Sequence, residues 1–308
     1  MHKLIAITSR AKYLGLLGIL GIVLDVAHMR LLSLFWLLAL VEVFASPRRM
    51  WQSLQQLAGI PHIYLTHRFH LPSKETYRSQ IAYGLPFEGE WVVVNGGTDR
   101  RSSHSWGIPT QRYAYDFLII DDEGKTYQGD ATRVESYYCY GKKILAPADG
   151  EVVAVSAHQR DSRTFGDGTV DPTTKDILGN FIIIDHGESE FSFIGHLKPG
   201  SIAVVVGQEV HRGEVIGRCG NSGNTSEPHV HLHVQDGKSV FASAGLPVAF
   251  DGITATRHEG YEQRDPRPLP EELLADTSVA NDSARCYIHR GQRVANAASG
   301  TPPRSSTG

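Results

Sequence analysis

The feature that most limits the fold is a series of short apolar segments between Pro86 and Leu246, separated by Gly, Pro and Asp residues. They recur about every ten residues, a spacing typical of an all-β sandwich or barrel. No alternation of strand and helix and no phosphate-loop glycine pattern occurs there, which argues against a nucleotide enzyme. The sequence therefore predicts an all-β domain, an antiparallel sandwich or barrel-like sheet, over residues 86–263.

The N-terminus has a different composition. Two apolar runs, 13–27 and 31–45, follow a basic start and are separated by His28, Met29 and Arg30. Each run would be about 22 Å long as a helix, against a hydrocarbon core of about 30 Å. We predict a membrane anchor over residues 1–46, made of one or two short hydrophobic helices. A cleaved signal peptide is the alternative, although a second apolar run argues against simple cleavage.

Two further segments flank the β domain. Residues 47–85 are expected to be a connector with a short helix around Met50–Ala58. Residues 264–308 are rich in Pro, Ser, Ala, Arg and Gly with little apolar periodicity, which predicts a disordered tail.

Charge and cysteine content exclude some classes. The 308 residues carry a net charge of -3, which predicts no nucleic-acid partner. Three cysteines are too few for a disulfide scaffold, and none form Cys-x-x-Cys metal spacing.

The chemistry is concentrated in a histidine-rich strand that follows Pro228. Side chains at i and i+2 of a strand share a face, so His229, His231 and His233 should lie together, opposite an apolar face. Neighbouring imidazoles on a rigid strand can hold a zinc ion and place a base beside it. The alternative is a polar strand face with surface histidines.

A second candidate is Asp116, the one carboxylate in the apolar segment Arg112–Ile120. An ionised carboxylate in such surroundings is costly unless it is paired or binds a metal. Either a structural pair with Arg112 or a metal site would explain it.

A set of motifs between residues 146 and 231 occurs in a particular order. They are Ala146–Gly150, Gly195–Leu197, Val206–Val210, Gly213–Gly217, Gly220–Gly223 and Pro228–His231. In this order they resemble the lysostaphin-type zinc metalloendopeptidases, which cut peptide cross-bridges or stem peptides of bacterial peptidoglycan. The resemblance covers about half of the chain, from Pro86 to Leu246, and implies the duplicated hybrid motif fold.

The resemblance also implies site roles. It makes Asp116 and His231 ligands of Zn2+, and His229 and His196 the residues that assist catalysis. The family's usual third ligand is a histidine four residues before the Asp, where this chain has Arg112, which has no lone pair to offer. The segment Gln111–Asp116 is similar to a branch that carries Gln-Arg-Tyr-Ala-Tyr-Asp and a histidine in the preceding loop. This makes His104 the expected third ligand.

The resemblance therefore implies a zinc-dependent metalloendopeptidase that acts on peptidoglycan peptides. With a single N-terminal crossing, the anchored β domain would lie outside the cytoplasm, in the periplasm or at the cell surface. A hairpin of both apolar runs would instead return it to the cytoplasmic side. A catalytically inactive relative that serves as a cell-wall-binding or regulatory module stays open, and Arg112 favours it. A phosphotransfer or lipoyl-like carrier fits less well, because a paired His-x-His serves it poorly.

Overall fold

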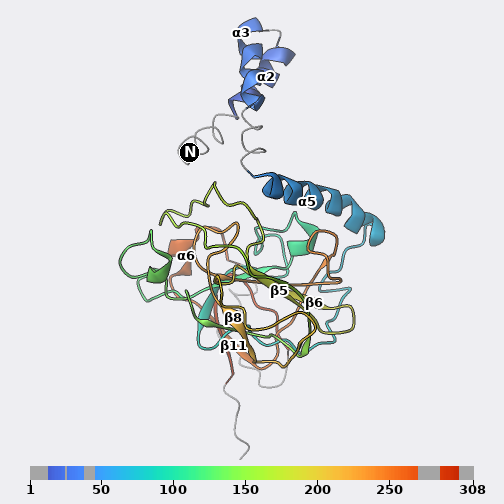
Figure 1. Ribbon diagram of the computed structural model, residues 1–308, viewed down its shortest axis with the longest axis vertical. Helices are drawn as coiled ribbons and strands as arrows, with labels where there is room; N and C mark the ends of the chain where they lie inside the picture. Colours follow the sequence, from blue (N-terminus) through green and yellow to red (C-terminus); the bar gives the residue numbers. More distant parts are fainter. Residues whose placement is uncertain (1–12, 25, 38–45, 270–284, 298–308) are drawn as a thin grey trace, which may run out of the picture.

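The described part of the computed structural model is dominated by one antiparallel β-sheet (Figure 1). The structure describes residues 13–24, 26–37, 46–269 and 285–297. Ten strands form the sheet in the order β11-β12-β1-β2-β9-β6-β5-β4-β7, with β10 also paired to β9, and β3 pairs separately with β8. All these pairings are antiparallel, so the prediction of an all-β domain with antiparallel strands is confirmed. The strands are β1 Trp91–Asn95, β2 Tyr115–Leu118, β3 Lys143–Leu145, β4 Gly150–Ser156, β5 Phe181–Asp185, β6 Phe191–Gly195, β7 Glu209–Val210, β8 Val215–Arg218, β9 Val230–Gln235, β10 Gly245–Leu246, β11 Ile253–Arg257 and β12 Gln292–Asn296.

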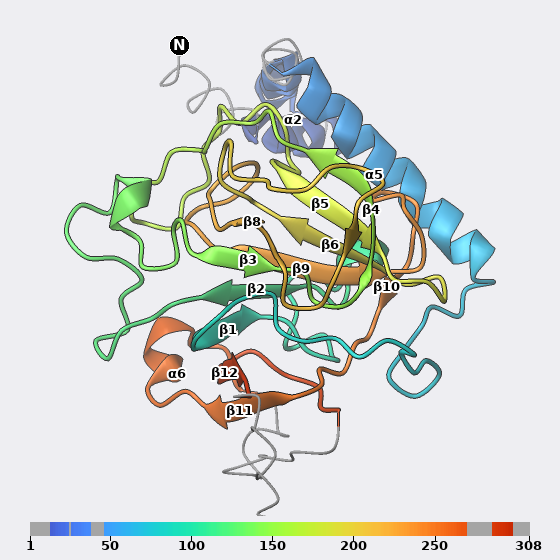
Figure 2. The same cartoon turned by 60° about the horizontal axis from the view of Figure 1, so that its bottom comes forward.

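The histidine strand β9 lies at the centre of this sheet, between β2 and β6 (Figure 2). All six of its residues are buried. Val230, Leu232 and Val234 belong to the hydrophobic core, whereas His231 and His233 occupy the alternate positions. The predicted alternation of faces is therefore confirmed. The alternative of surface histidines is wrong for His231 and His233, which are both buried, while His229 precedes the strand and is half-buried.

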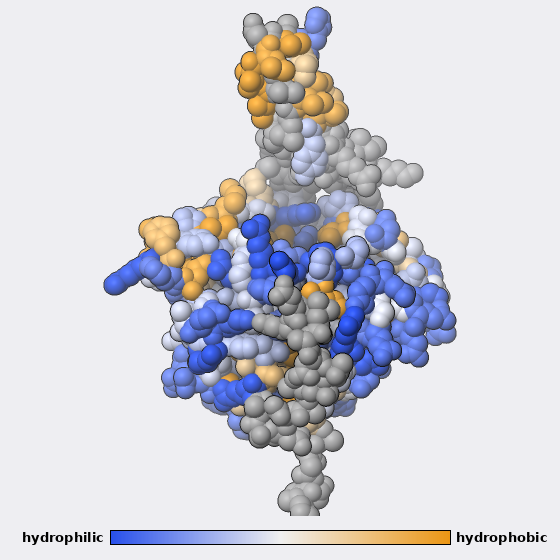
Figure 3. Space-filling view, turned by 180° about the vertical axis from the view of Figure 1, so that it is seen from behind, coloured by the Kyte–Doolittle hydropathy of each residue, from blue (hydrophilic) through white to orange (hydrophobic). Residues whose placement is uncertain are grey.

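The apolar N-terminal residues form short helices. They are α2 Leu14–Val23, α3 Ala27–Arg30 and the 3-10 helix η1 Leu31–Leu37. Apolar side chains gather on this segment (Figure 3). None of the described helices is both long enough and apolar enough to cross a membrane. The ten residues of α2 span about 15 Å. The predicted membrane anchor over 1–46 is therefore not supported, and its residues 1–12, 25 and 38–45 lie outside the described residues.

The connector contains a longer helix than predicted, α5 Pro47–Thr66. Gln52 fastens it to the β domain, because its Nε2 donates to Asp176 Oδ1 at 2.8 Å and its Oε1 accepts from Ile177 N at 2.9 Å. Gly59 lies against the backbone of Phe241, where an added Cβ would stand only 1.6 Å from the carbonyl oxygen. Contacts with residues far away in sequence thus hold this helix of twenty residues against the β domain.

The C-terminal region corrects another expectation. Residues 264–308 were predicted to be disordered, yet β12 lies between β1 and β11 in the sheet. The segment that leads into β12 is fixed by the buried guanidinium of Arg290, which donates to Asp265 Oδ2 at 2.9 Å and to Pro268 O at 2.7 Å. The short helix α6 Tyr261–Arg264 precedes Asp265. The prediction is wrong for residues 285–297, and 270–284 and 298–308 lie outside the described residues.

Candidate functional site

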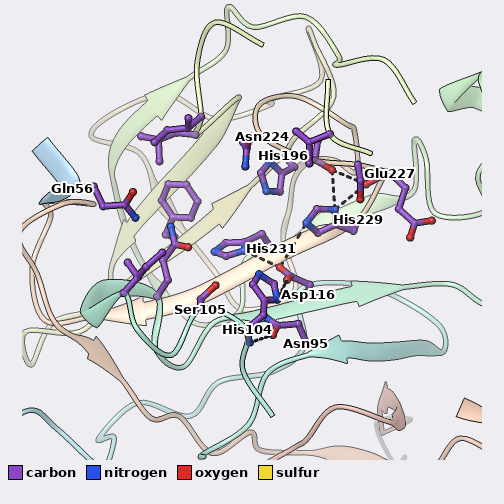
Figure 4. Close-up of a pocket in the computed structure, with 18 of the residues that line it drawn as sticks. Gln56, Asn95, His104, Ser105, Asp116, His196, Asn224, Glu227, His229 and His231 are labelled. Atoms are coloured by element: carbon purple, nitrogen blue, oxygen red, sulfur yellow. Dashed lines mark hydrogen bonds and ion pairs between the residues drawn. The ribbon is translucent and has the colours of Figure 1, made fainter. Parts of the chain in front are cut away.

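A cleft of about 570 Å³ opens at one face of the central strands. The strands β2 and β9, the loop around His104, the turn at Asn224–Glu227 and helix α5 all contribute to its walls. The five residues predicted to act there all line this one cleft, and Figure 4 shows them together: His104, Asp116, His196, His229 and His231.

Asp116 lies at the centre of three imidazoles. Its Oδ1 is 2.8 Å from His231 Nδ1 and 3.6 Å from His229 Nε2, and its Oδ2 is 4.0 Å from His104 Nδ1. The strand register produces this arrangement, because Asp116 on β2 is paired with His231 on β9. Burial acts to raise the pKa of the Asp116 carboxyl, but the hydrogen bond from His231 and the charges of the surrounding imidazoles hold it well below its usual range. The carboxylate is therefore ionised.

Arg112 takes no part in this cluster. Its Nη2 donates to Tyr64 Oη on α5 at 3.3 Å, and its guanidinium lies 5.0 Å from the centre of the Trp106 ring. The alternative that Arg112 pairs with Asp116 is therefore wrong. The buried carboxylate is surrounded by imidazoles instead.

The donor set fits a zinc ion in its chemistry. Zinc prefers imidazole nitrogen and carboxylate oxygen at about 2.0–2.2 Å, which separates tetrahedral donors by about 3.3 Å. The 2.8 Å and 4.0 Å distances from Asp116 to His231 and His104 lie on either side of this value. Within the described chain, no group of three or more His, Cys, Asp or Glu side chains is already drawn together as a metal site. The exposed side chain of His104, at 4.0 Å, is the one of the three that would have to move closer to share an ion with Asp116.

The other two histidines present a defined nitrogen to the cleft. His229 Nδ1 is 2.8 Å from the carbonyl oxygen of Glu227, and His196 Nδ1 is 2.7 Å from that of Ser222. A carbonyl oxygen only accepts, so in both rings Nδ1 carries the proton and Nε2 of the neutral ring keeps its lone pair. Their ring centres are 4.6 Å apart.

Two buried histidines are held in the neutral form. Burial lowers the pKa of His196 to about 3, and the charges of His229 and His231 add to the effect. Burial likewise lowers the pKa of His233 to about 3. His196 also has a positive φ of 59°, a strained conformation for a residue with a side chain. The sequence gives no sign of that strain.

Asn95, on β1, is a site residue that the sequence did not reveal. Its Oδ1 accepts from the backbone N of His104 at 2.8 Å, and its Nδ2 donates to Ala114 O at 3.3 Å. Asn95 therefore ties the His104 loop to the segment that enters β2. The signal for Asn95 in the sequence was a polar residue at the end of an apolar strand.

Removing this tie should loosen the loop. We expect Asn95→Ala to lower the free energy of unfolding by about 1–3 kcal/mol, because it leaves the His104 N–H without its acceptor and removes a buried amide that joins two segments. It should also weaken zinc binding, since His104 is held less firmly. Chemical denaturation and a chelator competition would measure the two effects. Asn224→Ala is the matched control, since Asn224 lines the same cleft but is exposed. Equal effects of the two variants would contradict the role of Asn95.

Comparison with known proteins identifies the class. Residues 134–242 match the model of Peptidase family M23. The chain thus contains an M23 domain, of the lysostaphin-type family, as the motif order predicted. His196, His229 and His231 fall inside the matched segment, whereas His104 and Asp116 precede it.

Particular relatives match shorter stretches. The chain is 38% identical over 89 residues to the peptidoglycan DD-endopeptidase ShyA of Vibrio cholerae serotype O1, which covers 28% of this chain and 20% of that protein. It is 43% identical over 58 residues to endolysin 2638A of Staphylococcus phage 2638A, which covers 18% of this chain and 12% of the endolysin. The chain thus spans a fifth or less of the length of these relatives. A solved zinc-containing peptidase from Vibrio cholerae aligns at 21% identity with a TM-score of 0.33, over 53% of this chain and 39% of that one.

Proposed function

We propose that this protein is a zinc-dependent metalloendopeptidase that hydrolyses peptide bonds in peptidoglycan cross-links or stem peptides. The observation that carries the proposal is the cluster of His104, His229 and His231 around the ionised Asp116, in an open cleft. The M23 domain supports the substrate class, and so does the similarity to the Vibrio cholerae peptidoglycan DD-endopeptidase. That substrate would place the β domain in the periplasm or at the cell surface.

His104, Asp116 and His231 would hold the zinc ion. When bound there, zinc would polarise the scissile carbonyl and lower the pKa of water toward about 7. A set of two neutral imidazoles and one carboxylate leaves one of the two positive charges of the ion uncompensated, which suits this chemistry.

His229 is the proposed general base. Its Nδ1 proton is engaged by the Glu227 carbonyl, so its Nε2 lone pair is free and lies 3.6 Å from Asp116, beside the proposed ligands. This nitrogen would take a proton from the attacking water and return it to the leaving amine.

His196 is proposed to hold the attacking water. Because its Nδ1 proton goes to Ser222 O, and because its low pKa keeps it neutral, its Nε2 can only accept a hydrogen bond. A neutral ring of this tautomer orients a water molecule; it offers no proton to an oxyanion. Two roles are open to His196, stabilising the oxyanion or holding the water, and this geometry favours holding the water.

The competing function is a catalytically inactive module that binds cell wall. Arg112, at the position of the family's usual ligand, favours it. The presence in one cleft of all four remaining site residues, Asp116, His196, His229 and His231, argues against this function. Binding alone does not require histidines whose protons are held at defined nitrogens.

Cleavage of purified cross-linked muropeptides separates the two functions. We expect the full chain to release new amino groups, to lose this activity when zinc is removed by a chelator, and to regain it when zinc is restored. Asp116→Asn should be inactive under all three conditions. If the wild-type chain holds stoichiometric zinc and binds peptidoglycan but releases no amine, the binding module is the correct function.

A further inference from the structure

A line of buried side chains continues from the proposed metal site along one face of β9. His231 Nε2 is 3.0 Å from His233 Nδ1, and His233 Nε2 is 3.0 Å from Gln235 Oε1. Gln235 Nε2 in turn donates to Gly237 O at 2.6 Å. His233 is 1% exposed and Gln235 is fully buried, so water does not compete for these groups.

The donor and the acceptor of each hydrogen bond in this line can be worked out by starting from Gln235. The Gln235 amide nitrogen is used by the Gly237 carbonyl, so its oxygen faces His233 and can only accept. His233 therefore carries its proton on Nε2 and presents a lone pair on Nδ1. A doubly protonated His233 would bury a charge with no carboxylate in contact, which is costly.

The same logic fixes His231. Its Nε2 must donate to His233 Nδ1, which leaves the lone pair of a neutral His231 on Nδ1. That nitrogen faces Asp116 Oδ1 at 2.8 Å. A nitrogen lone pair and a carboxylate oxygen directed at one another are complementary to a cation shared between them, which is a proton when His231 donates to Asp116 and would be the metal ion when one binds.

Packing holds the two rings in this orientation. The Phe193 ring stacks on His233 with centres 4.9 Å apart and meets His231 edge to face at 5.8 Å. Rotation of either imidazole would break this packing together with the hydrogen bond between them.

We infer that His233 and Gln235 are positioning residues that fix the tautomer of His231 so that its Nδ1 is committed to the metal. This inference rests on the proposed function, since it assigns a purpose to the orientation of a proposed zinc ligand. A hydrogen-bond partner of a ligand histidine contributes to metal affinity by holding the ring and its proton. Here the partner is a second histidine, which an amide holds in turn.

The first test reads the protons directly. In the full chain labelled with 15N-histidine, long-range proton–nitrogen correlation spectra should show His233 as the Nε2–H tautomer, assigned by its loss in His233→Phe. This measurement requires no zinc and no activity. An Nδ1–H signal for His233 would overturn the inference whatever the protein does.

The second test measures zinc affinity by chelator competition. His233→Phe keeps the aromatic packing against Phe193 but removes the acceptor, and should weaken zinc binding by about 10–100-fold. His233→Asn should retain most of the affinity, because its Oδ1 can accept near the position of Nδ1. Gln235→Met should give a smaller loss than His233→Phe, since it acts one step further away.

His186→Phe is the matched control. His186 is half-buried and makes two hydrogen bonds, to Asp149 O and Ser192 Oγ, but touches none of the proposed ligands. Its replacement should leave zinc affinity unchanged. A folded His233→Phe variant with wild-type affinity would overturn the inference while the proposed function stands. A wild-type chain that binds no zinc would instead refute the proposed function. The tautomer measurement would still show whether His233 and Gln235 fix the tautomer of His231.

Discussion

His231→Ala is expected to abolish zinc binding and peptide cleavage together, whereas His229→Ala should keep the zinc and lose only the cleavage. His231 Nδ1 lies 2.8 Å from Asp116, directed into the proposed ligand set, and its other nitrogen is occupied by His233. His229 reaches the same carboxylate only at 3.6 Å, and its Nδ1 is tied to a backbone carbonyl. A ligand contributes to holding the ion, while a general base contributes about 10²–10⁴-fold to the rate.

Elemental analysis of the purified full chain and the rate of muropeptide cleavage would measure the two effects. Asp116→Ala should behave like His231→Ala, because both remove a proposed ligand from paired positions of β2 and β9. The informative contrast is between two histidines two residues apart on one strand. If both variants lose zinc equally, the roles of His229 and His231 are misassigned.

Much of the sheet could be predicted because its signals are local. The alternation of Val230, Leu232 and Val234 with histidines marks β9 as a strand, and its burial follows from its place between β2 and β6. β12 could not be predicted in this way. It has one buried apolar side chain, Val294, and exists because β1 and β11 both offer it a pairing edge.

Helix α5 shows the same limit from another direction. Its pattern predicted a helix, but its length and position depend on Gln52 and Gly59, whose partners lie more than a hundred residues away. Arg49, Ser53 and Gln56 of this helix line the cleft, although the helix lies outside the matched M23 segment. The wall of the site could not be assigned from motifs alone.

The proposed site was partly visible in the sequence for a physical reason. Asp116 stands out because a carboxylate among apolar neighbours requires a partner, and the His-x-His pair stands out because a strand places both rings on one face. The proton arrangement could not be predicted. It depends on the carbonyls of Ser222 and Glu227, which any residue could supply.

His104→Ala is expected to weaken zinc binding as severely as Asp116→Ala. The loss of affinity should exceed the value of about 10–100-fold that is typical when a ligand loses its hydrogen-bond partner. A catalytic zinc site normally takes three protein ligands, and Arg112 supplies none. Among the imidazoles around Asp116, His104 faces its Oδ2, while His229 and His231 both face Oδ1. It therefore lies on the side of the carboxylate that the other two histidines leave open.

Arg112→Ala is the control that separates loss of a ligand from loss of local structure. The guanidinium contacts Tyr64 on α5 and the Trp106 ring, so its removal should loosen α5 and lower the thermal midpoint without releasing zinc. Chelator competition on all three variants, each checked for folding by circular dichroism, gives the comparison. Full zinc occupancy in His104→Ala would show that another residue completes the site, and His229 would then be the nearest nitrogen. In that event the proposed base would itself be a ligand, and the assignment of His229 as general base would have to be abandoned.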